Sequence, residues 1–176
     1  RKVMKDNGAT VHIIASLDDV AWLTNMRGND IEFYPLIFSY ALVRLDGMDL
    51  FIDEKKLDAA AKAHLASNNI SIKPYNDIYE AVKEIKAGET VLIDPMKMNY
   101  ALYNNIPDGV EKVECQNPTI LMKAMKNDIE LKNIRAAHIK DGIAVTKFMY
   151  WMKTNVGKIK ITELSAAEKL ESFRKE

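Results

Sequence analysis

The 176-residue sequence is 48% hydrophobic, and its 25 basic residues balance its 25 acidic residues to a formal net charge of zero. This apolar content excludes a disordered chain, and the lack of a basic excess argues against a nucleic-acid partner. No apolar run approaches the roughly 20 residues that span a bilayer, so we expect no membrane partner. A single cysteine excludes an internal disulfide framework and fits a reducing compartment, so we predict a cytoplasmic protein.

Short β-branched runs alternate with helical patterns in the first part of the chain. Gly8 would end the first helix, and Asp46-Gly47 between two apolar runs predicts a β-hairpin. In chain order the expected elements are a helix over 1–7, a strand over 10–16, a helix over 17–25, strands over 37–45 and 48–53, and a helix over 55–67.

The helix expected over 17–25 starts with Asp18 and Asp19, which are favourable at the positive end of a helix dipole. Val20, Trp22 and Leu23 would form its apolar face.

The same alternation continues to about residue 116. It predicts a strand over 70–75, a helix through Ile78, Val82 and Ile85 that ends at Gly88, a strand over 91–94, a helix over 99–105 and a strand over 110–115. Strands that alternate with helices, together with one hairpin, predict an α/β domain with a mixed β-sheet flanked by helices over residues 1–117.

The pattern changes after Pro118. Residues 121–125 form a short apolar segment, and Asn127 can cap a long helix that runs to about Asn155. A second helix would open at Thr162 or Ser165. Two helices without a sheet form a poor core, so we expect 118–176 to be the start of a second, incomplete domain. The first residues are typical of the tail of a helix cut in mid-course, and the last residues have a helical pattern without a stop signal, so we expect both ends to be cut points.

The sequence contains no self-contained catalytic motif. His12, His64 and His138 form no pair with metal-ligand spacing, so we predict no metal ligand, and there is no G-x-S-x-G or P-loop. Structural roles are expected for His12 and His64, and an ordinary helix-surface pair for His138 with Asp141. Cys115 lacks a Cys-His motif around it and is expected to be a small apolar filler at a strand end.

Three stretches carry a resemblance to a known family. Residues 17–30 (LDDVAWLTNMRGND), followed by Tyr34-Pro35 and 38–40 (FSY), resemble a stretch of the three-domain Xaa-Pro aminopeptidases (aminopeptidase P) of the creatinase/prolidase superfamily. Residues 134–142 (IRAAHIKDG) and 161–167 (ITELSAA) are similar to two later segments of that family. The matches follow the family's order and spacing across nearly the whole chain.

The resemblance implies a creatinase-N-like domain followed by the first helices of a pita-bread metallopeptidase domain. It also implies an enzyme that removes the N-terminal residue from peptides with proline in second position. Two divalent metals, usually manganese, would activate the attacking water. The family's metal ligands map onto no position here, so we expect no catalytic residue, no bound metal and no activity in this piece alone. We further predict a homodimer.

Substrate-binding candidates come from the matched motifs. Arg27, with Asn25 beside it, could orient a peptide carboxylate, or it could brace a loop; Trp22 is expected to be core material. Lys123 resembles a basic position near the family's cleft. Two alternatives stay open: a prolidase or creatinase relative, and a metal-free pita-bread protein that binds other proteins, as in a histone-chaperone subunit. The sequence beyond Glu176 would separate them.

Overall fold

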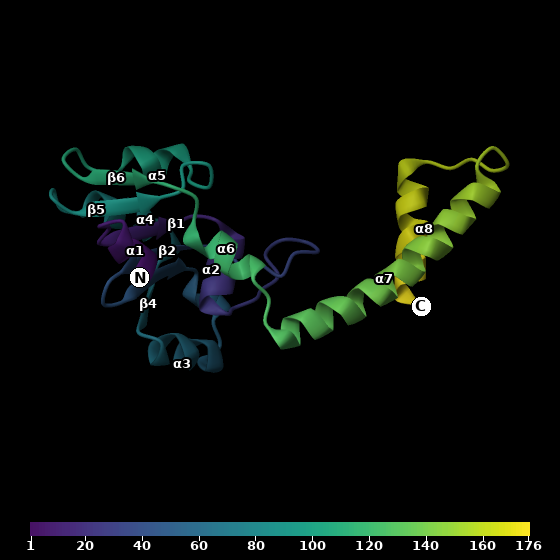
Figure 1. Ribbon diagram of the computed structural model, residues 1–176, viewed down its shortest axis with the longest axis horizontal. Coiled ribbons are helices and arrows are strands. Elements are labelled where there is room, and N and C mark those ends of the chain that lie inside the picture. The colour runs from purple at the N-terminus through teal and green to yellow at the C-terminus, as the bar shows by residue number, and fades with distance from the viewer. The chain divides into compact units, whose positions relative to one another are not determined.

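The computed structural model describes all of residues 1–176, in two compact units, Arg1–Ala124 and Met125–Glu176. Figure 1 shows their secondary structure, and each unit is described by itself. No helix in either unit combines the length and the apolar character needed to cross a membrane.

The first unit is built on a six-stranded mixed sheet with the order β4-β3-β2-β1-β5-β6. The strands are β1 (Val11–Ile14), β2 (Ser39–Arg44), β3 (Met48–Ile52), β4 (Ile70–Lys73), β5 (Thr90–Ile93) and β6 (Glu111–Glu114). β2 pairs antiparallel with both β1 and β3, and every other pairing is parallel. Five strands therefore end at the same edge of the sheet, which we call the carboxyl edge. The predicted α/β class, mixed sheet and hairpin are confirmed.

Helices cover both faces of this sheet. The elements between the strands are α1 (Lys2–Asp6), α2 (Leu17–Thr24), η1 (Glu54–Lys56), α3 (Ala59–Ser67), η2 (Tyr75–Asp77), α4 (Ile78–Lys83) and α5 (Tyr100–Asn104), and α6 (Pro118–Ala124) follows β6. One core contains Val20 of α2 and Leu65 of α3; the other contains Ile78 and Val82 of α4 and Leu102 of α5. Burying the two faces against different helices makes the unit an α/β/α sandwich.

Local signals explain where most helices begin and end. At the end of α1, Gly8 has φ +68°, and the amides of Gly8 and Ala9 donate to the carbonyls of Lys5 and Met4, which is a Schellman cap. The helix expected over 55–67 starts instead at Ala59, because the Asp58 side chain accepts from the Ala61 amide.

One sequence expectation in this unit is wrong in detail, and one segment is better defined by the structure. The buried side of α2 carries Asp19, Val20 and Thr24, whereas Leu23 is 39% exposed and Trp22 is only half-buried. The apolar segment after Pro118 is the helix α6, with proline in the first turn, where its missing amide hydrogen costs nothing.

The second unit consists of two helices, α7 (Asp128–Asn155) and α8 (Glu163–Lys175), which pack on each other. The predicted caps are confirmed: Asn127 forms a capping box with Glu130, and Thr162 forms one with Ser165. The long helix α7 is scarcely buried, because Ala144 is its one buried residue.

Candidate functional site

The loop between α2 and β2, residues 25–38, contains Arg27 and Gly28, and we call it the arginine-glycine loop. Backbone hydrogen bonds join its two sides. The Gly28 amide donates to the Pro35 carbonyl over 3.3 Å, and the Asp30 amide donates to the Leu36 carbonyl over 3.1 Å. The Asp30 carboxylate accepts from the Phe38 amide at 2.8 Å and from the Lys56 ammonium at 2.6 Å. Burial raises the pKa of the Asp30 carboxyl, but these two donors outweigh it, so that the pKa lies below its usual value.

Asn25 and Arg27 lie together at the end of α2. Asn25 ends the helix with φ 54°, a left-handed conformation that asparagine tolerates. Arg27 Nη1 donates to the carbonyls of Ala21 and Met26, both over 2.8 Å, so the guanidinium braces the last turn of α2. Both side chains are exposed and line a hollow of about 400 Å³ with His64.

Lys123 lies at the opposite end of α2, where it pairs with two carboxylates. Its ammonium contacts Asp18 and lies 2.9 Å from Oδ1 of Asp19, which has no exposed surface. The other oxygen of Asp19 accepts from the Ser16 hydroxyl and, over 3.1 Å, from Asn117 Nδ2. This set, which we call the α6 anchor, ties the end of β1 and the start of α2 to α6.

The charges of the α6 anchor stabilise one another. Burial alone would raise the pKa of the Asp19 carboxyl, but hydrogen bonds from Ser16, Lys123 and Asn117 hold the pKa below its ordinary value. Burial alone would lower the pKa of Lys123, but the two aspartates outweigh it and raise that pKa. The carboxylate and the ammonium are therefore both charged at neutral pH.

The three histidines lie apart, and a ring nitrogen of each contacts a backbone carbonyl. His12 is buried with Nδ1 2.9 Å from the Leu92 carbonyl, His64 Nε2 contacts the Thr24 carbonyl, and His138 Nδ1 contacts the Ile134 carbonyl. The hydrogen bond from Arg174, at 2.7 Å, lowers the pKa of the Asp141 carboxyl, and the expected neighbour His138 lowers it further to a smaller extent. Cys115 is half-buried just after β6, beside one of the cores, and burial raises the pKa of its thiol.

Nowhere do three or more His, Cys, Asp or Glu side chains gather in a way that could hold a metal. Residues 1–176 therefore do not fit a two-metal centre, and we assign no catalytic step to them.

His12 makes the stability of the protein depend on pH near neutrality. Burial lowers its pKa, although the Leu92 carbonyl, Asp19 and Asp94 partly oppose this. The unfolded chain therefore takes up the proton first, so stability should be full above about pH 6.5 and fall as the pH drops below it, by at most about 1.4 kcal/mol per pH unit. Urea unfolding between pH 5.5 and 7.5 should show this slope, and it should vanish in His12→Asn, which keeps a donor near Nδ1. Identical slopes in both proteins would contradict the prediction.

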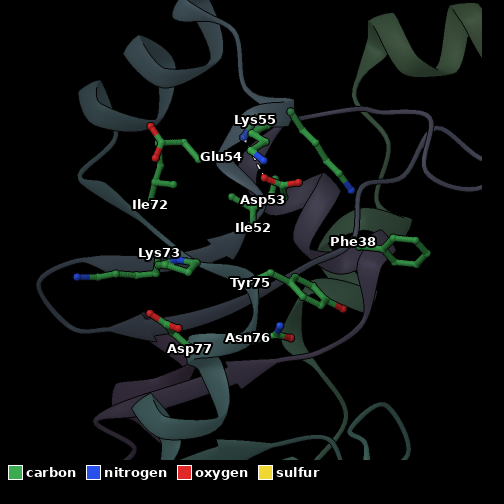
Figure 2. A pocket seen from close by; sticks show the side chains of 12 residues that line it. Phe38, Ile52, Asp53, Glu54, Lys55, Ile72, Lys73, Tyr75, Asn76 and Asp77 are labelled. Atoms are coloured by element: carbon green, nitrogen blue, oxygen red, sulfur yellow. Dashed lines mark hydrogen bonds between the residues drawn. The ribbon is translucent and has the colours of Figure 1, made fainter.

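A larger hollow of about 870 Å³ lies at the carboxyl edge, where β3 and β4 end. Figure 2 shows the rings of Tyr75 and Phe38 on one side of it, Lys73 and Asp77 on the other, and Asp53 above the ring of Tyr75. Sequence reasoning missed this place, because no motif joins the segments after β3 and β4. The available signal was that residues after parallel strands meet at one edge.

Comparisons with known proteins agree with this architecture. The sequence profile of the Creatinase/Prolidase N-terminal domain matches residues 1–130. Xaa-Pro aminopeptidase 1 of Dictyostelium discoideum is 38% identical over 183 residues, which cover 100% of this chain and 28% of that protein. The chain thus spans less than a third of the length of this relative.

Solved structures show the same likeness. The X-prolyl aminopeptidase of Caenorhabditis elegans, described as a cytosolic enzyme with a di-nuclear active site, matches with a TM-score of 0.85 and 31% identity, over 99% of this chain and 29% of that one. The Xaa-Pro dipeptidase of Bacillus anthracis shares the fold, with a TM-score of 0.69 and 16% identity over 99% of this chain and 46% of that one. The resemblance read from the motifs is confirmed, and the chain belongs to the creatinase/prolidase N-terminal domain family.

Proposed function

We propose that this chain is part of an Xaa-Pro aminopeptidase, which removes the N-terminal residue from peptides with proline in second position. The observation that carries the proposal is that the Dictyostelium Xaa-Pro aminopeptidase and the C. elegans X-prolyl aminopeptidase align with essentially the whole chain at 38% and 31% identity. The di-nuclear site described for the C. elegans enzyme supports a mechanism with two divalent metals, which we propose to be manganese.

In this proposal the chain supplies a supporting module and not the metal site. We propose that residues 1–117 form the creatinase-N-like domain and that 118–176 are the first helices of a pita-bread catalytic domain. Because α6 packs on α2, the first compact unit extends to Ala124. The cytosolic description of the C. elegans enzyme supports a cytoplasmic location.

A homodimer is a further part of the proposal. The helix pair of the second unit leaves large apolar side chains open to solvent, and such a surface is typical of a face that another element or subunit covers. The most exposed are Ile129, Ile139, Ile143, Met149, Tyr150 and Leu164.

For substrate contacts we propose Arg27 with Asn25. Arg27 uses Nη1 for the carbonyls of Ala21 and Met26, and its exposed side chain lies with that of Asn25 at the 400 Å³ hollow. A guanidinium held in this way is suited to a peptide carboxylate. For Lys123, the ion pairs with Asp18 and Asp19 support anchoring of α6 rather than direct contact with the substrate.

The proposal is tested by comparing this chain with the whole enzyme. The 176-residue chain should hydrolyse no Xaa-Pro peptide with added Mn²⁺ and should show no tight Mn²⁺ site by isothermal titration, because no cluster of metal ligands exists in it. The longer protein that contains this chain should hydrolyse Xaa-Pro peptides and should bind Mn²⁺ tightly. Turnover by the short chain would overturn the division of roles, and a longer protein inactive on all Xaa-Pro peptides would overturn the function.

A further inference from the structure

We propose that the 870 Å³ hollow at the carboxyl edge of β3 and β4 is a binding site for short peptides with free, charged ends. Its size falls within the roughly 300–1,000 Å³ that is usual for small-molecule sites. In open α/β sheets, ligands bind outside the carboxyl ends of the strands. β3 and β4 run parallel, so both end at this hollow.

The floor of the hollow is apolar and aromatic. Ile52 is buried at the end of β3, Tyr75 is half-buried after β4, and the Phe38 ring is 44% exposed. The Tyr75 ring packs against Tyr40 with 5.1 Å between ring centroids, and Lys56 Nζ lies 5.6 Å from the Phe38 ring centroid. The Tyr75 ring is thus held by a neighbouring ring, and both rings offer an apolar surface that suits an apolar side chain or a proline ring.

Charged side chains of both signs line the hollow, and some of them form no ion pair. Lys56 is paired with Asp30 and Glu54 with Lys62, so these charges are compensated within the chain. The side chains of Lys55, Lys73 and Asp77 also line the hollow, and no ion pair in the structure involves them.

Asp53 adds a second carboxylate to these walls. It accepts from the Lys55 amide through Oδ1, which leaves its other oxygen for a ligand. Figure 2 shows the charged side chains of Asp53 and Lys55 above the ring of Tyr75.

A ligand that matches this site needs an ammonium, a carboxylate and an apolar body. Short peptides meet all three needs: their amino end can pair with Asp53 or Asp77, and their carboxylate with Lys55 or Lys73. A purely anionic ligand would meet the two aspartates, and a purely apolar one would leave four charges without partners. The choice of peptides among zwitterions rests on the proposed peptidase function.

Binding can be measured on this chain without any catalysis. The probe is the tripeptide alanyl-prolyl-leucine, added up to about 10 mM to the ¹⁵N-labelled 176-residue chain, a range that detects millimolar dissociation constants. We expect saturable amide shifts confined to residues 52–56 and 72–77. The same peptide with an acetylated amino end and an amidated carboxyl end should bind about tenfold more weakly, because both charge pairs are lost and each contributes roughly threefold.

Variants assign the site to particular side chains. Lys55→Gln combined with Asp77→Asn should raise the dissociation constant about tenfold, since each lost exposed charge pair contributes roughly threefold. Both residues are exposed, so the fold is retained. The matched control combines Lys97→Gln with Asp108→Asn, which are exposed and outside the hollow, and should bind as the parent does. Tyr75→Ala should also weaken binding, with Tyr100→Ala, an exposed tyrosine elsewhere, as its control.

Three results would overturn the inference: no saturable shifts, equal binding of the capped peptide, or equal loss of binding in the control variants. None of them depends on hydrolysis. A failed binding experiment with an active longer enzyme therefore rejects the site alone, whereas an inactive longer enzyme rejects the proposed function.

Discussion

Replacing Lys123 by methionine is expected to lower the free energy of unfolding by about 3 kcal/mol, which is usual when one partner of a buried ion pair is removed. Lys123 Nζ lies 2.9 Å from Oδ1 of Asp19, a side chain with no exposed surface. Methionine keeps the length and apolar stem of lysine but leaves the carboxylate without its cation. Urea unfolding of both proteins at pH 7 measures the difference.

The exposed pair Lys83–Glu80 provides the control for this prediction. Its side chains are 50% and 72% exposed, so Lys83→Met should cost less than about 0.5 kcal/mol.

The sign of the pH dependence gives a second check. The pKa of Asp19 is lowered in the parent, so its contribution is present above the unfolded value near 3.9 and is lost as the pH falls through the folded value. The difference in the free energy of unfolding between the parent and Lys123→Met should therefore become smaller in acid. A loss below 1 kcal/mol that does not change with pH would contradict the role of the α6 anchor.

Sequence reasoning succeeded where the deciding contacts are local. The capping box of Asn127 with Glu130 spans three residues, and the Gly8 cap closes within one turn, so both were readable from neighbouring letters. The hairpin around Asp46-Gly47 is another local signal that the structure confirms. The strand and helix order of the first unit follows from such signals.

It failed where the contacts are distant. Asp19 was assigned only a favourable place in a helix dipole, but its main partner, Lys123, lies 104 residues further on. The face of α2 that packs on the core contains Asp19, so Leu23, which was predicted to belong to the apolar face, is exposed to solvent. An ion pair between residues so far apart leaves no periodic pattern in a single sequence, so it could not be predicted.

Gly28→Ala is expected to be the most damaging small substitution in the arginine-glycine loop. A Cβ at this position would lie 2.2 Å from Cγ1 and 2.9 Å from Cδ1 of Ile37, and Ile37 is only 8% exposed. Cγ1 can move away only by rotation of Ile37 about its Cα–Cβ bond, which is restricted in a buried β-branched side chain, so we expect the loop backbone to move. Overpacking of this kind costs about 1–3 kcal/mol, and we expect the upper end because the Gly28 amide also bonds the Pro35 carbonyl.

A compensating substitution makes this prediction specific. Ile37→Ala alone should cost about 2–4 kcal/mol, because it leaves a cavity in the core. In the double variant the new Cβ of residue 28 enters the space that Ile37 vacates, so the combined loss should be smaller than the sum of the single losses by about 1–2 kcal/mol. Urea unfolding of the four proteins closes this cycle. Strict additivity would mean that Ile37 is not the obstacle.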